Sequence, residues 1–281
     1  MQNTYSLHKI NSIESLGFSP THYSKFKYGD DAIAQEFGTC LAEGFIKDQL
    51  MKYPIDTQIV VISSPFAFIP TATFAMKNYF VFRLNRWLAS NNFQVVQETK
   101  VTRSITYKED YGELDEIQRM KLIGNDKFHI DKDFLKDKVL IFLDDIKITG
   151  SHEKMITKML REYNLENETH LLYFAELSNR NIHPNVENFL NYYCVKSILD
   201  LDGIIKNERF AINTRIVKYI LSGDSTIFKI FIQNHHNSFL ELLYDMAIGN
   251  SYHTIEAYRE NLTTLESHIQ KITQTQNIIT I

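Results

Sequence analysis

The chain has 281 residues, a net charge of −4 and 23% charged side chains, and no block of Lys and Arg dominates it. This composition argues against nucleic acid or an anionic membrane as the main partner. The two cysteines, Cys40 and Cys194, are far apart and lack a metal or redox spacing, so we expect a reducing, cytoplasmic location. Neither a signal peptide nor a stretch of membrane-spanning length is evident.

The first part of the chain predicts a short strand, a turn and a capped helix. Residues 5–10 suit the strand and residues 17–20 the turn. The helix is expected from Gly29 onward, with Asp30 or Asp31 as its cap. Its apolar positions recur at helical spacing: Ile33, Phe37, Leu41 and Phe45.

A buried strand is predicted at residues 57–63, followed by the polar and turn-forming residues Ser63, Ser64 and Pro65. Pro70 suits the first turn of a helix that continues through residues 73–90. Residues 93–97 are typical of a second strand.

Residues 99–127 are polar and charged. A loop of this length in a compact domain is usually functional or disordered. Residues 113–123 also suit an amphipathic helix with Leu114, Ile117 and Met120 inward. The two interpretations are compatible, and both stay open.

The most informative stretch is residues 138–160, KVLIFLDDIKITGSHEKMITKML. Five apolar residues, 139–143, predict a strand buried on both faces of a parallel sheet. Asp144 and Asp145 follow, then a small-residue turn around Gly150 and a helix from Ser151. Backbone N–H groups at such a helix start favour an anion. The stretch therefore combines a phosphate cradle with two carboxylates that suit sugar hydroxyls or Mg²⁺. The simpler alternative is a βα unit with solvated acids and a capped helix.

Another strand is predicted at residues 169–175, and from about residue 192 the pattern is helical. We expect His235 and His236 at the surface. The expected helices span residues 195–205, 210–221, 225–232, 239–248 and 255–272.

These elements predict an α/β fold with a mostly parallel, open sheet flanked by helices. Residues 1–205 would form this domain and residues 206–281 a helical C-terminal subdomain, packed on the sheet domain or on a second copy in a homodimer. Ligands of open parallel sheets bind at the carboxyl ends of the strands. That rule places four segments along one rim: Ser63-Ser64, residues 99–103, Asp144-Asp145 and residues 176–180.

The sequence VLIFLDDIKITGSH resembles the signature of the type I phosphoribosyltransferases, which bind 5-phosphoribosyl-1-pyrophosphate (PRPP). The resemblance implies that Asp144 and Asp145 hold the ribose hydroxyls directly or through Mg²⁺, with or without water between the ion and the carboxylates. The 5′-phosphate would lie on Ile148, Thr149, Gly150, Ser151 and His152. Lys147 and His152 depart from the usual pattern, in which an aliphatic residue and Thr or Ser stand at these positions.

The segment Lys27-Tyr28-Gly29-Asp30 is similar to the ComF-like branch of that family. The resemblance implies an N-terminal hood over residues 1–56, with Lys25, Lys27 and Tyr28 on the acceptor side. By the same resemblance, Ser63 and Ser64 would contact pyrophosphate, although this loop lacks the Gly-rich or Arg-containing sequence of many members. A flexible lid would include Lys100, Arg103, Tyr107 and Lys108, and the acceptor side would also include Glu176 and Arg180. Surface or turn-forming roles remain the alternatives.

By resemblance, we expect Mg²⁺-dependent transfer of the phosphoribosyl group of PRPP to a nitrogen acceptor with release of pyrophosphate. The acceptor is not readable from the sequence. Ile148 stands where the hypoxanthine-guanine branch has an acidic base, which disfavours a purine enzyme using that base. A non-catalytic sensor of PRPP or a nucleotide is the second hypothesis, and a helical interaction protein with a vestigial sheet domain is the third.

Overall fold

The computed structural model describes residues 2–103 and 128–279. Within these residues, five parallel strands form the central sheet in the order β1-β7-β6-β2-β3. The strands are β1 (Gln2–Ile10), β2 (Ile59–Ser63), β3 (Gln97–Glu98), β6 (Val139–Lys147) and β7 (Thr169–Leu177). A small antiparallel pair joins β4 (Thr102–Arg103) to β5 (Phe128–His129). The α/β fold with an open parallel sheet is confirmed.

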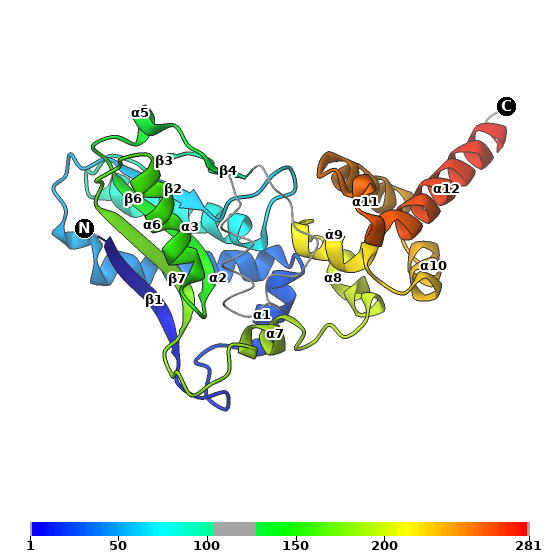
Figure 1. Cartoon of the computed structure of the whole chain (residues 1–281), viewed down its shortest axis with the longest axis horizontal. Coiled ribbons are helices and arrows are strands. Elements are labelled where there is room, and N and C mark those ends of the chain that lie inside the picture. Colours follow the sequence, from blue (N-terminus) through cyan, green and yellow to red (C-terminus); the bar gives the residue numbers. More distant parts are fainter. Residues whose placement is uncertain (1, 104–127, 280–281) are drawn as a thin grey trace.

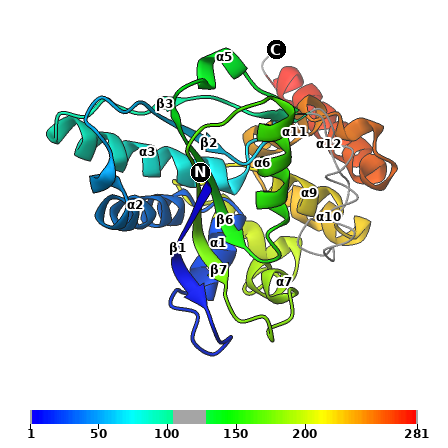
Figure 2. The ribbon, with the colours of Figure 1, turned by 60° about the vertical axis from the view of Figure 1, so that its left-hand side comes forward.

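Helices cover both faces of the sheet, with α2 (Asp31–Asp48) and α3 (Ala72–Ser90) on one side and α6 (Ser151–Glu162) on the other (Figure 2). Alternate residues of β6 enter separate cores because successive strand side chains point to opposite faces. Ile141 and Leu143 pack in the core that contains α2 and α3. Leu140 and Phe142 pack in the core that contains α6. The continuous apolar run in this strand therefore matches a sheet buried on both sides.

The remaining elements near the sheet are short. They are α1 (Pro20–Lys27), η1 (Leu50–Lys52), α5 (Lys132–Leu135) and α7 (Val186–Asn191). Asp30 caps α2 by accepting a hydrogen bond from the Ile33 N–H at 3.2 Å. The predicted cap at this position is confirmed.

The C-terminal part is helical and gathers at the end of the molecule away from the sheet (Figure 1). Its elements are η3 (Ile198–Leu201), α8 (Asp202–Ile205), α9 (Thr214–Leu221), α10 (Ser225–Gln233), α11 (Asn237–Gly249), η4 (Tyr252–Thr254) and α12 (Glu256–Ile279). They enclose a third core, which also takes in Tyr28 and Ile69 from the sheet-bearing part. The proposed boundary at residues 205 and 206 stays a prediction.

Several predicted elements differ from the structure in their bounds, and for three of them the contacts show the reason. The strand expected at residues 93–97 is reduced to β3, because Phe93 packs against Trp87 and the Val96 N–H donates to Asn85 Oδ1 at 2.8 Å. The helix expected from residue 195 begins only at Ile198, where Ser197 and Asp200 form a capping box. The helix expected from residue 210 begins at Thr214, because Asn213 is its cap.

His235 also differs from the expectation. Its side chain is only 3% exposed and its ring packs on Phe231 with centroids 4.1 Å apart. The prediction of a surface position is wrong for this residue. Among the described residues, no helix combines the length and apolar character that a membrane crossing requires.

Candidate functional site

Asp144 and Asp145 lie near the carboxyl end of β6, the central strand. The strand does not stop before them, as the sequence suggested, but continues to Lys147, which pairs with Glu176 of β7. The two carboxylates lie close enough together for the Thr73 hydroxyl to contact both, at 3.3 Å from Asp144 Oδ1 and 3.1 Å from Asp145 Oδ1. The Asp144 side chain is 19% exposed and the Asp145 side chain 7%.

Asp145 is held by side chains of α1 and α3. Tyr23 and Lys27, both on α1, donate hydrogen bonds to Asp145 Oδ2. The Thr73 hydroxyl, in the first turn of α3, lies 3.1 Å from Oδ1. Burial raises the pKa of the Tyr23 hydroxyl well above its usual value, and the negative charge of Asp145 raises it further. Tyr23 is therefore a neutral donor at neutral pH.

Asp144 has a different set of partners. The Ser64 hydroxyl donates to Oδ1 at 2.7 Å, and the Asp145 backbone N–H donates to the same atom at 3.0 Å. His152 Nδ1 lies 3.0 Å from Oδ2. Burial by itself raises the pKa of Asp144, but His152, the Ser64 hydroxyl and Lys27 lower it more. The pKa of Asp144 is therefore well below its usual range, and the group is a carboxylate at neutral pH.

The loop from Ile148 to His152 leads directly from β6 into α6. Gly150 has φ +74° and stands at the N-cap position, a left-handed conformation that favours glycine. The hydroxyls of Thr149 and Ser151 lie 2.7 Å apart, and Ile148 packs against the core. The first N–H groups of a helix have no acceptor within it, so this helix start can hold an anion.

Beside this loop, Lys147 joins two acidic side chains. Its Nζ lies 2.9 Å from Glu153 Oε1 and 3.3 Å from Glu176 Oε1. Burial lowers the pKa of Lys147, but the two carboxylates outweigh it, so the pKa is raised. The Ser6 hydroxyl donates to Glu176 Oε2 at 3.1 Å. Lys147 therefore balances the charge of Glu153 at the start of α6, and Glu176 belongs to this cluster.

The other predicted site residues are dispersed. Ser63 pairs with Leu143 in the sheet, so Ser64 is the serine that reaches the acidic pair. Tyr28 is fully buried, with its ring centroid 5.2 Å from that of Tyr219 in the C-terminal core. Lys25 is half-buried and Arg180 is exposed on the loop after β7.

Of the predicted lid, only Lys100 can be placed with its side chain. Its Nζ donates to the Ala67 carbonyl at 2.7 Å and lies 4.1 Å from the centre of the Phe66 ring. Arg103 is in β4, and its side chain is not among the described ones. Tyr107, Lys108 and the alternative helix at 113–123 lie outside the described residues.

Sequence reasoning missed Tyr23 and Thr73. The spacing of Tyr23 and Lys27 is one helical turn, which places both on one face of α1. Thr73 follows the loop after β2, at the carboxyl edge of the sheet, where ligands of such folds bind. Both signals were present, but neither indicates Asp145 as the partner.

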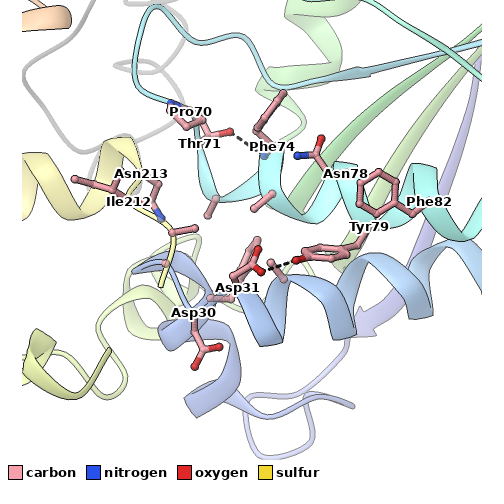
Figure 3. Close-up of a pocket in the computed structure, with 16 residues that line it drawn as sticks. Asp30, Asp31, Pro70, Thr71, Phe74, Asn78, Tyr79, Phe82, Ile212 and Asn213 are labelled. Atoms are coloured by element: carbon pink, nitrogen blue, oxygen red, sulfur yellow. Dashed lines mark hydrogen bonds between the residues drawn. The ribbon is translucent and has the colours of Figure 1, made fainter. Parts of the chain in front are cut away.

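A separate cavity of about 270 Å³ lies on the other side of the first turn of α3 (Figure 3). Ala72 and Ala75 line it, whereas Thr73 of the same turn contacts the acidic pair. At one end the Tyr79 hydroxyl donates to Asp31, which also accepts from Arg209 at 3.0 Å. Most of the lining is apolar: Phe26, Ala34, Pro70, Phe74, Phe82, Ala211 and Ile212.

The acidic pair does not fit a directly bound divalent ion. Each of its four carboxylate oxygens already lies against a hydroxyl or nitrogen of the protein. Within residues 2–103 and 128–279, no group of three or more His, Cys, Asp or Glu side chains could hold a metal ion. The acidic pair, as arranged here, is therefore engaged by donors of the protein itself and does not present a ready-made site for a protein-coordinated cation.

Among solved structures, this chain is similar to the hypoxanthine-guanine phosphoribosyltransferase of L. donovani. The identity is 12% and the TM-score 0.31, over 52% of this chain and 70% of that one. A hypoxanthine phosphoribosyltransferase from Staphylococcus aureus is 11% identical, with a TM-score of 0.31, over 51% and 74%. The hypoxanthine phosphoribosyltransferase from Trypanosoma cruzi is 12% identical, with a TM-score of 0.31, over 54% of this chain and 77% of that one. At these identities and TM-scores, the similarities do not assign a role to any residue of this chain.

The comparison with curated proteins finds no match. A family model described as PRTase ComF-like matches residues 1–265, which is nearly the whole chain. The signature at residues 144–152 predicted the wider family, and the segment at residues 27–30 predicted this branch. The chain belongs to the ComF-like family of phosphoribosyltransferases.

Proposed function

We propose that the chain binds PRPP and transfers its 5-phosphoribosyl group to a nitrogen acceptor, releasing pyrophosphate. The observation that carries this proposal is the placement of the carboxylate Asp144 beside the Gly150 turn and the start of α6. One site thus offers acceptors for sugar hydroxyls and donors for a phosphate. Family membership supports phosphoribosyl transfer in general.

In the proposed reaction, the acceptor nitrogen attacks C1 of the ribose while the bond from C1 to the pyrophosphate oxygen breaks. The acceptor loses a proton, and pyrophosphate leaves with the bonding electrons. Positive charge develops on the ring, which the carboxylates of Asp144 and Asp145 stabilise electrostatically. The loop at residues 148–152 would hold the 5′-phosphate through backbone N–H groups and the Thr149 hydroxyl.

Mg²⁺ remains part of the proposal as an ion carried by PRPP. A hard cation suits pyrophosphate oxygens and neutralises the leaving group. Because the carboxylate oxygens are already engaged, we expect water between such an ion and Asp144. Cations on the lid, such as Lys100, would assist in holding pyrophosphate.

Calorimetry with PRPP and Mg²⁺ tests the proposal. We expect micromolar binding by the native chain and at least about tenfold weaker binding by Thr149→Val and by Asp144→Asn, because hydrogen bonds to charged groups contribute about 1.5–3 kcal/mol. Thr157→Val, within α6 and bonded to Gln2 and Glu153, is the matched control. Absence of PRPP binding by the folded native chain would overturn the proposal.

A second candidate function is a non-catalytic sensor of PRPP or a nucleotide. Tyr23 and Lys27 occupy Asp145, which leaves this carboxylate without an open side for the sugar. Pyrophosphate release in the presence of a panel of nitrogen nucleophiles separates the two. Tight PRPP binding without release of pyrophosphate by any of them would favour the sensor.

A further inference from the structure

We propose that Lys27 is the built-in cation of the acidic pair, so that the pair works without a metal ion bound to its carboxylates. The inference rests on the proposed function, because it concerns how the same site engages the sugar. Lys27 is a positioning residue: it acts on Asp145 and not on the reacting atoms.

The contact between Lys27 and Asp145 is enclosed. Their side chains are 11% and 7% exposed, and Tyr23 donates to the same oxygen that Lys27 contacts. Thr73 engages the other oxygen of Asp145 at 3.1 Å. A divalent ion at Asp145 would have to displace the ammonium group from its hydrogen-bonded carboxylate partner in a largely buried setting, which is costly. Mg²⁺ also requires near-octahedral oxygen ligands, and the surrounding donors are a phenol, a hydroxyl and an amine.

The backbone that carries Lys27 is held from both sides. The buried Ser24 hydroxyl donates to the Asn191 carbonyl at 2.8 Å. The Lys27 carbonyl accepts from the Asn213 side chain at 3.2 Å. Tyr23 and Phe26 of the same helix are 0% and 1% exposed. The ammonium group is therefore placed by a packed helix and is not a mobile surface charge.

Two consequences follow for ligands. The part of the site that meets ribose and its 5′-phosphate needs no metal, because Lys27 already balances Asp145. Any dependence on Mg²⁺ belongs to the pyrophosphate of PRPP. Removing the charge of Lys27 frees a carboxylate beside Asp144 and turns the pair into a cation site.

Binding of Mn²⁺, followed by electron paramagnetic resonance on the full ligand-free chain, tests this directly. We expect Lys27→Met to gain a Mn²⁺ site that the native chain lacks at the pair, and Lys27→Arg to behave as native. The added site should disappear when Lys27→Met is combined with Asp145→Asn. Lys25→Met, two positions away on α1, is the matched control and should gain nothing.

Native Mn²⁺ binding that Asp145→Asn removes would overturn the inference, as would a folded Lys27→Met chain that gains no site. Near-ultraviolet circular dichroism establishes folding of each variant. Should Lys27→Met not fold, calorimetry of the native chain with ribose 5-phosphate decides instead. We expect the same affinity with Mg²⁺ and with EDTA, and a requirement for Mg²⁺ would refute the role of Lys27.

The two proposals can fail separately. If neither ribose 5-phosphate nor PRPP binds, the proposed function fails, while the Mn²⁺ measurement still decides what Lys27 does at Asp145. If PRPP binds but the native pair also coordinates Mn²⁺, only the inference about Lys27 fails.

Discussion

Asp145 is the residue through which the N-terminal helix α1 and the central strand β6 are joined. Its carboxylate faces Lys27 in a setting almost closed to water. Replacing it by Asn removes the charge of the carboxylate that pairs directly with a buried ammonium group, so we expect Asp145→Asn to lower the free energy of unfolding by about 3 kcal/mol. Urea unfolding measures this, with the exposed Asp56→Asn as control. Equal losses for both variants would contradict the argument.

Gly29 permits the approach of two distant segments. It has φ +98°, and a Cβ placed there would lie 2.4 Å from the Ala211 carbonyl oxygen. The N–H of Ala211 in turn donates a hydrogen bond to the Gly29 carbonyl at 2.9 Å. We expect Gly29→Ala to cost about 1–3 kcal/mol of stability. Gly203→Ala, where a Cβ meets nothing within 4 Å, should be neutral or slightly stabilising in the same thermal unfolding assay.

Among the elements, α3 connects the acidic pair with the apolar cavity. Its N-cap Thr71 accepts a hydrogen bond from the Phe74 N–H at 3.2 Å, and Thr73 follows in the first turn. Thr71→Ala should destabilise the chain by about 1 kcal/mol, because the Phe74 N–H loses its side-chain acceptor and keeps only the Thr71 carbonyl at 3.1 Å. Thr71→Ser keeps the acceptor and should stay near native. A urea midpoint unchanged by Thr71→Ala would refute this role.

Elements were predictable where the local pattern was long and regular. The apolar run before Asp144 predicted β6, and the Gly150 turn predicted the start of α6. The strand at residues 93–97 was not predictable to its true length, because packing of Phe93 on Trp87 competes with strand pairing. The same holds for residues 209–213, which run along residues 29–31 instead of extending α9.

For the whole molecule, buried histidines couple folding to pH. Burial lowers the pKa of His8, His170 and His235, which lie in different parts of the fold. The unfolded chain, with a His pKa of about 6.5, then binds more protons than the folded chain. The contribution of these histidines to stability is present above the unfolded-state pKa. It is lost as the pH falls through that value towards the lowered pKa values of the folded chain.

We therefore expect a lower urea midpoint at about pH 5.5 than at about pH 7.5. The dependence on pH should be weaker in His170→Gln, because one of the three groups no longer takes up a proton on unfolding. Proton uptake on unfolding at about pH 6, measured by calorimetry in buffers of different ionisation enthalpy, checks the sign. Release of protons under those conditions would contradict the expectation.

The sequence by itself determined the parallel α/β class, the strand-turn-helix unit around Asp144 and Gly150, and the resemblance that the family match over residues 1–265 confirms. These depend on apolar period, turn chemistry and capping among near neighbours in the chain. Only the tertiary structure decided what the acidic pair touches. Lys27 and Tyr23 reach Asp145 across 118 and 122 positions, and such contacts arise from how α1 packs on the sheet, which no local pattern encodes.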